Sequence, residues 1–177
     1  MLVILGPTGA GKSSQAKRLA TKFDSYVWIE IGGVLRNSVD QTILKTLKKG
    51  LLISDDLVTA LMAEAIGKVS GAKQPLLDGY PRSMGQTDRL ESISKRLKRR
   101  VLRVVYLKIS RDIANRRLKL RGRMDDKSAT IDQKWQVFMT ETLPVIEHYR
   151  RKGIVAEIDG SGNVEDVGKN IELALSL

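Results

Sequence analysis

GPTGAGKS, residues Gly6 to Ser13, matches the pattern GxxxxGK followed by Ser or Thr, without a gap. It follows an apolar run at residues 2–5 and precedes an amphipathic stretch at residues 12–23 that is predicted to be helical. Glycines let successive backbone N–H groups turn inward around phosphate oxygens, and the N-terminus of the following helix favours the same anions. In this context the motif predicts a P-loop, in which Lys12 contacts the β- and γ-phosphates of a nucleotide and Ser13 ligates Mg²⁺.

Apolar runs and amphipathic stretches alternate along the rest of the chain. Pro144 predicts a kink or break in the last long helix, residues 128–151. The alternation predicts an α/β fold with three layers, in which helices flank a five-stranded parallel sheet. We predict strands at residues 2–5, 26–31, 74–78, 101–107 and 154–158, and helices at residues 12–23, 33–49, 54–69, 86–99, 111–120, 128–151 and 164–175.

Composition narrows the class of protein. The chain has 177 residues, which predicts one domain spanning residues 1–177. It has no cysteine, so disulfides, thiolate zinc sites and cysteine nucleophiles are excluded. There is no signal-peptide pattern at the start and no apolar stretch long enough to span a bilayer, so we expect a cytoplasmic protein without a membrane partner.

The net charge of +11 favours anionic ligands in general. Much of it lies in the run KRLKRR at residues 95–100, which we interpret as a solvated surface. Nucleic-acid binding is disfavoured, because aromatic residues that could stack on bases are not interleaved with these charges.

A second informative block reads LLDGYPRSMGQ at residues 76–86. Asp78 falls at the carboxyl end of a predicted buried strand, where a carboxylate beside a P-loop can hold a water of Mg²⁺. Gly79 and Pro81 shape a turn that presents Arg82 to a phosphate as a two-point fork. By itself, this block also fits an ordinary turn with a surface arginine.

Four blocks, in this order and spacing, resemble the adenylate kinase family: GPTGAGKSSQA at residues 6–16, IGGVLR at 31–36, LLDGYPRSMGQ at 76–86 and GRMDD at 122–126. The resemblance covers almost the whole chain. It implies reversible phosphoryl transfer from Mg-ATP to AMP, giving two ADP, by a monomer with Mg²⁺ and without zinc. It also implies a single P-loop kinase domain with a helical NMP-binding segment at about residues 30–59 and a very short lid at about residues 121–127.

The P-loop pattern and the resemblance together imply the site residues. ATP contacts are expected from Gly9, Ala10, Gly11, Lys12, Ser13, Ser14, Arg117, Arg121 and Gly162. AMP contacts are expected from Ile31, Arg36, Leu51, Leu52, Ile53, Gly79, Arg82, Gln86, Arg123 and Lys134, with Gln86 on the base. Catalytic roles are expected for Lys12, Arg82, Arg121, Arg123 and Lys134, and metal contacts for Ser13 and, through water, Asp78.

The chain departs from the family pattern at three positions. Ile31 and Gly33 stand where the family carries threonine and aspartate, and Lys134 stands where it carries arginine. A kinase for UMP, CMP or another monophosphate is therefore one alternative, against which Gln86 argues. A weakly catalytic nucleotide-binding protein associated with RNA is another, disfavoured by the retained basic residues of the site.

Overall fold

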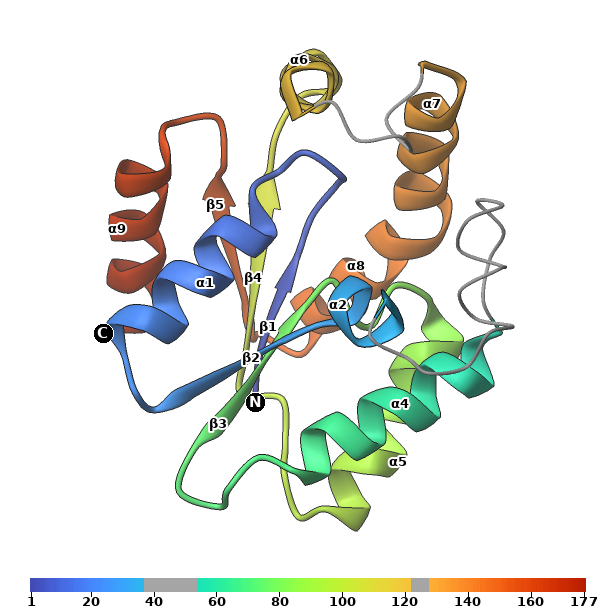
Figure 1. The fold of residues 1–177 in the computed structure, drawn as a ribbon, viewed down its shortest axis with the longest axis vertical. Helices are drawn as coiled ribbons and strands as arrows, with labels where there is room; N and C mark the ends of the chain where they lie inside the picture. Colours follow the sequence, from blue (N-terminus) through green and yellow to red (C-terminus); the bar gives the residue numbers. More distant parts are fainter. Residues whose placement is uncertain (37–53, 122–127) are drawn as a thin grey trace.

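The computed structural model describes residues 1–36, 54–121 and 128–177, with the backbone alone for 34–36, 121 and 128–130 (Figure 1). Its centre is one sheet of five parallel strands in the order β2-β3-β1-β4-β5, which confirms the predicted α/β fold. The strands are β1 (Leu2–Leu5), β2 (Tyr26–Glu30), β3 (Gln74–Asp78), β4 (Arg103–Lys108) and β5 (Val155–Asp159).

Both faces of the sheet are buried, because successive strand residues alternate between two apolar clusters. Leu2 and Ile4 point into one cluster, and Val3 and Leu5 point into the other. The first cluster packs under α1 (Lys12–Lys22), α6 (Arg111–Arg121) and α9 (Val164–Leu175).

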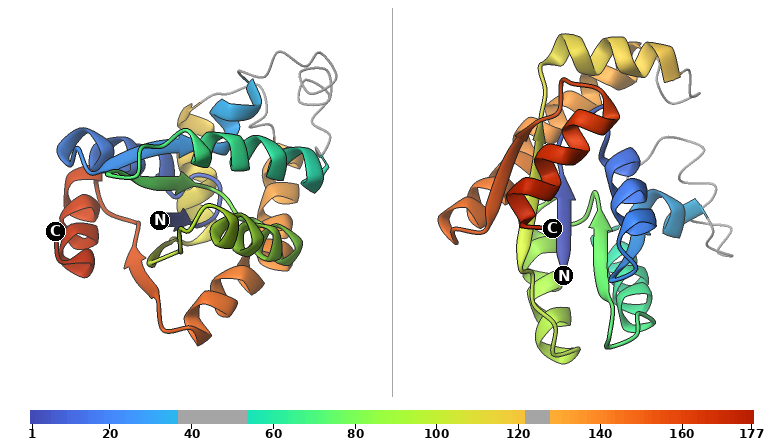
Figure 2. Two further views of the ribbon diagram at one scale, coloured as in Figure 1. Left: turned by 90° about the horizontal axis from the view of Figure 1, so that it is seen from below. Right: turned by 90° about the vertical axis from the view of Figure 1, so that its left-hand side faces the viewer.

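The second cluster packs under α4 (Asp55–Gly67), α5 (Met84–Arg96) and α8 (Leu143–Arg151). Seen from below, α1 and α9 lie on one side of the strands, and α5 and α8 lie on the other (Figure 2, left). The result is the predicted three-layer arrangement, with all strands ending at the upper edge in Figure 1.

The second predicted strand ends one residue early. The sequence predicts a strand through Ile31, but β2 ends at Glu30 and Ile31 begins the short helix α2 (Ile31–Arg36). The Ile31 side chain is buried in the second apolar cluster, so packing overrides its preference for extended backbone. The rest of the helix predicted at residues 33–49 lies outside the described residues, as do most of the proposed NMP-binding segment and the lid.

At the predicted kink or break near Pro144, the structure has a π-helical turn just before that proline and no break. Residues 128–151 form α7 (Ser128–Val137), a π-helical turn η1 (Phe138–Thr142) and α8. Leu143 N–H bonds to the oxygen of Phe138, five residues back, so the helix widens here without ending. Pro144 then follows directly after the widened turn, in the first turn of α8.

The basic run at residues 95–100 lies at the amino edge of the sheet, away from the P-loop. Its placement follows from two bonds: Leu102 N–H donates to Met1 O at 2.9 Å, and the Met1 amino group donates to Arg100 O at 2.6 Å. Lys95, Arg96, Lys98 and Arg100 are exposed, as predicted for a solvated surface. Across the described ranges, no helix has the length and apolar content needed to cross a membrane.

Candidate active site

The loop between β1 and α1 has the backbone that its glycines permit. Gly9 and Gly11 both have φ +89°, a conformation that side chains rarely adopt. A Cβ at Gly6 would lie 2.6 Å from the backbone oxygen of Leu107 in β4, so only glycine fits there. The Lys12 ammonium lies across the loop and donates to Gly6 O at 2.9 Å and Pro7 O at 2.8 Å. This is the geometry of a phosphate cradle with its cation in place.

A second loop, residues 160–162 after β5, lies beside this cradle. A Cβ at Gly160 would stand 3.4 Å from the backbone oxygen of Ala10. Arg117 of α6 fixes the loop by donating Nη1 to Gly160 O at 2.8 Å and Nη2 to the oxygens of Ser161 and Gly162, both at 2.9 Å. The fold therefore brings together Arg117 and Gly162, two residues expected at ATP.

The start of this loop is also ordered by a carboxylate. Asp159 Oδ1 accepts from the backbone N–H of Ser161 at 2.9 Å. Hydrogen bonding from Ser161, from its side chain first and its backbone N–H second, lowers the pKa of Asp159 more than the nearby charge of Arg117 does.

Asp78 is a buried carboxylate, 2 % exposed, at the carboxyl end of β3. In the sheet it stands opposite Ile4 of β1, just before the P-loop, and opposite Glu30 of β2. Trp28 Nε1 donates to Asp78 Oδ2 at 3.3 Å. Ser13 lies in the first turn of α1, so the carboxyl edge of the sheet carries a hydroxyl and a carboxylate. These are the hard oxygen donors that Mg²⁺ prefers, and the donor set fits that ion.

The turn after β3 holds Arg82 at the same edge of the sheet. Arg82 Nε donates to Gly79 O at 2.7 Å, and a Cβ at Gly79 would lie 3.0 Å from Arg82 Nη2. Gly79 has φ +72°, a backbone conformation that favours glycine. Loss of hydration lowers the pKa of Arg82, while the carboxylates of Asp78 and Glu30 oppose that shift. An arginine is not deprotonated in proteins, so the guanidinium stays charged.

Gln86, in the first turn of α5, is 8 % exposed and held on two sides. Its Oε1 accepts from Arg82 N–H at 2.8 Å, and its Nε2 donates to Asp55 Oδ1 at 2.6 Å. The buried Tyr80 hydroxyl donates to Gln86 O at 3.4 Å, and burial raises the pKa of that phenol. Gln86 thereby joins the turn that carries Arg82 and the N-terminus of α4 into one polar cluster.

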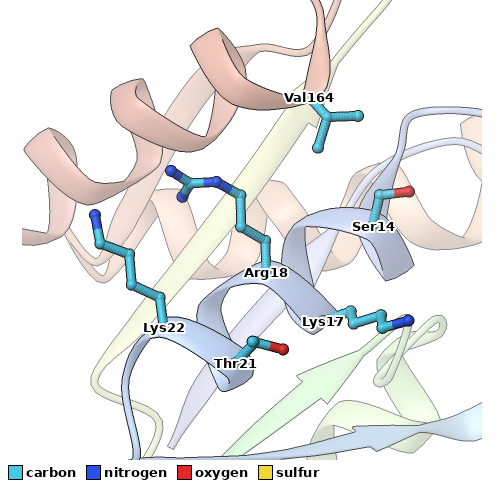
Figure 3. Close-up of a pocket in the computed structure, with 6 residues that line it drawn as sticks. All are labelled: Ser14, Lys17, Arg18, Thr21, Lys22 and Val164. Atoms are coloured by element: carbon cyan, nitrogen blue, oxygen red, sulfur yellow. The ribbon is translucent and has the colours of Figure 1, made fainter.

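The remaining predicted residues are distributed as follows. Ile31 is buried among apolar side chains, and Lys134 lies half-buried on α7. Ser14 lies at a surface hollow between α1 and α9, together with Lys17, Arg18 and Val164 (Figure 3). Arg36 and Arg121 end helices α2 and α6, and their side chains lie outside the description, as do Leu51, Leu52, Ile53 and Arg123 entirely.

The hollow itself is distinct from the phosphate cradle. Figure 3 shows Arg18 directed toward α9, where it pairs with Glu165 at 3.1 Å and also contacts Glu172. Lys22 pairs with Glu172 at 2.8 Å. Arg18 and Lys22, two of the basic side chains that line the hollow, therefore hold α9 against α1.

Four side chains at the site were not identified from the sequence: Trp28, Glu30, Asp55 and Thr142. Thr142 Oγ1, in the π-helical turn, donates to Arg82 O at 3.0 Å. In the sequence, Asp55 is part of a helix-capping cluster, and Trp28 is an aromatic residue that could stack on a base but is better suited to packing. A carboxylate at the end of a second buried strand was the one signal that could have indicated Glu30.

Comparison with known proteins identifies a family. A family model described as "Adenylate kinase" matches residues 4–154. The chain is 34% identical to an adenylate kinase of Prochlorococcus marinus, over 99% of this chain and 98% of that protein. It is 32% identical to the adenylate kinase of Hyphomonas neptunium over 98% and 97% of the two chains, and 34% identical to that of Xanthomonas euvesicatoria over 98% of each.

Proposed function

We infer that this chain, which belongs to the adenylate kinase family over nearly its whole length, transfers a phosphoryl group reversibly from ATP to AMP, giving two ADP. The single observation that carries this inference is the meeting of two loops at one edge of the sheet. The P-loop follows β1, the turn carrying Arg82 follows β3, and the two strands are adjacent in register. A donor nucleotide on one loop and an acceptor on the other can therefore approach each other.

The chemistry suits the residues at this edge. Phosphoryl transfer spreads negative charge over the migrating group, so catalysis rests on positioning and on electrostatic stabilisation. Lys12 and Arg82 are cations held by backbone oxygens at fixed places on the two loops. We propose that Lys12 binds the β- and γ-phosphates, that Arg82 binds the AMP phosphate, and that Arg117 orders the loop over which the ATP base lies.

We propose that Ser13, directly, and Asp78, through water, hold Mg²⁺. When bound, the ion neutralises charge on the phosphate oxygens of ATP. The burial of Asp78 and its bond from Trp28 support this role, because they fix the carboxylate beside the P-loop. The remaining ATP contacts are proposed at Gly9, Ala10, Gly11, Ser14 and Gly162, by the motif and the family resemblance.

On the acceptor side, we propose that Gln86 and Gly79 contact AMP together with Arg82. Ile31, Arg36, Leu51, Leu52 and Ile53 would complete this pocket from an NMP-binding segment at about residues 30–59. Arg121, Arg123 and Lys134 would neutralise charge between the nucleotides around a short lid at about residues 121–127. We further propose that the protein acts as a cytoplasmic monomer.

The first experiment incubates the purified protein with Mg-ATP and each of AMP, UMP, CMP and GMP, and follows diphosphate formation. Rapid ADP formation with AMP alone supports the proposed acceptor. Turnover with only one of the other monophosphates would assign a different acceptor base and leave the proposed mechanism unchanged. ATP binding without turnover on any acceptor would contradict the proposed function.

A further inference from the structure

The side-chain amide of Gln86 is fixed in one orientation. Arg82 N–H can only donate, so the atom 2.8 Å from it must be the amide oxygen. A carboxylate accepts, so the atom 2.6 Å from Asp55 Oδ1 must be the amide nitrogen. The two contacts agree, and together they oppose a flip of the amide, which would place oxygen against oxygen at one end and nitrogen against N–H at the other.

Asp55 is itself held in place. Ser83 Oγ donates to Asp55 Oδ2 at 3.2 Å and accepts from the backbone N–H of Gln86 at 3.2 Å as the cap of α5. Asp55 also lies in the first turn of α4, where the unpaired N–H groups and the helix dipole favour a negative charge. Asp55, Ser83 and Gln86 thus form a closed set of bonds between the starts of two helices.

The fixed amide still has bonding capacity for a ligand. An amide oxygen has two lone pairs and an amide nitrogen two N–H groups, and the contacts to Arg82 and Asp55 use one of each. Among the residues that the structure describes, these contacts leave one acceptor and one donor of the amide, in an order set by the protein. The Ile31 side chain, which is also expected on the AMP side, is buried among apolar residues and offers no polar group for a base.

That order discriminates between purines. Along its pairing edge, adenine presents an amino donor beside a ring-nitrogen acceptor, whereas guanine presents a carbonyl acceptor beside a ring N–H donor. An amide that satisfies one edge must flip to satisfy the other, because the donor and acceptor exchange places. A site that cannot flip its amide therefore leaves polar groups of the wrong base unpaired, which strongly weakens binding.

We propose that Asp55 is a specificity-determining positioning residue: by holding the Gln86 amide, it selects 6-aminopurine over 6-oxopurine monophosphates. This inference rests on the proposed function, in which the acceptor base lies against Gln86. Asp55 acts through Gln86 and contacts neither the base nor the reacting phosphates.

The test is the ratio of kcat/KM for AMP to kcat/KM for GMP in Asp55→Asn. Asparagine keeps the shape of the side chain but can donate as well as accept, so it tolerates both orientations of the Gln86 amide. Arg82 N–H still favours the original one, so we expect the ratio to fall about tenfold. We expect KM for ATP to stay unchanged. A general loss of structure would instead change KM for ATP as well.

Asp56→Asn is the matched control. Asp56 is the next residue, its side chain is 87% exposed, and it pairs with Arg89 at 2.7 Å, so the substitution makes the same change in charge without touching Gln86. We expect its AMP-to-GMP ratio to match the wild type. A second test places Asp55→Asn in a Gln86→Leu background, where it should no longer change the ratio. A further fall there would overturn the proposal, because Asp55 would then act independently of Gln86.

The outcomes separate this inference from the proposed function. If the wild-type protein does not prefer AMP to GMP, the proposed acceptor is wrong and the inference falls with it. If the wild type prefers AMP and folded Asp55→Asn keeps the full ratio, the inference is overturned and the proposed function stands.

Discussion

The hydroxyl of Thr142 donates a hydrogen bond of 3.0 Å to the backbone oxygen of Arg82, sixty residues earlier in the chain. Thr142 is 6 % exposed and ends the π-helical turn between α7 and α8. The widened turn thus connects the long helical segment to the loop that carries the proposed AMP-phosphate arginine. π-Helical turns within α-helices occur frequently at functional sites.

Thr142→Val should destabilise the loop that carries Arg82 without creating a cavity, because the two side chains have nearly the same shape. The oxygen of Arg82 loses its hydroxyl partner, which costs about 1 kcal/mol in the free energy of unfolding. We expect KM for AMP to rise about threefold to tenfold while KM for ATP stays unchanged. Steady-state kinetics with each nucleotide varied in turn, together with thermal unfolding, measures both effects.

Thr140→Val is the control for that substitution. Thr140 lies in the same turn, but its exposed side chain donates to the oxygen of Gln136 at the end of α7. An equal rise in KM for AMP in both variants would show that the turn, and not the bond to Arg82, is responsible.

Arg117→Lys should affect the ATP side. Arg117 reaches three consecutive backbone oxygens through two nitrogens of one planar guanidinium, and an ammonium cannot reproduce that fork. We expect KM for ATP to rise about tenfold, with a smaller change in KM for AMP. Arg116→Lys changes the exposed neighbour and should leave both KM values unaltered; a matching effect there would contradict the specific role of Arg117.

Lys12→Met should remove the cation from the phosphate cradle while keeping the length of the side chain. We expect kcat to fall about 100-fold or more, since one lost electrostatic contact to the developing charge has effects of that size. Lys17→Met on the exposed side of α1 tests whether a general loss of positive charge is enough. Retention of more than a tenth of wild-type kcat in Lys12→Met would argue against the proposed role.

Lys134→Arg should raise turnover. Lys134 lies on α7, at a position where the family resemblance implies an arginine, and lysine supplies charge without a planar two-point grip. We expect kcat to increase about threefold, a change of less than 1 kcal/mol in the activation free energy. If turnover is unchanged or lower, the present lysine is already adapted to its surroundings.

The sequence by itself determined the parts of this protein whose signals are local. The P-loop was predicted because its glycines, lysine and serine follow each other directly, between a strand and a helix. The five strands were predicted because a buried parallel strand is a short apolar run, whatever its neighbours are. The predicted end of the second strand at Ile31 was wrong. A β-branched residue favours a strand, but tertiary packing can override that preference, and Ile31 begins a helix.

Only the tertiary structure decided which polar groups meet. The strand order β2-β3-β1-β4-β5 brings Trp28 to Asp78, and helix packing brings Asp55 to Gln86 and Thr142 to Arg82, across separations of 50, 31 and 60 residues. No periodic or local pattern in the sequence indicates these bonds, because a hydrogen bond depends on the positions of two atoms and not on their separation along the chain. The orientation of the Gln86 amide, and with it the proposed choice of base, is therefore set by packing.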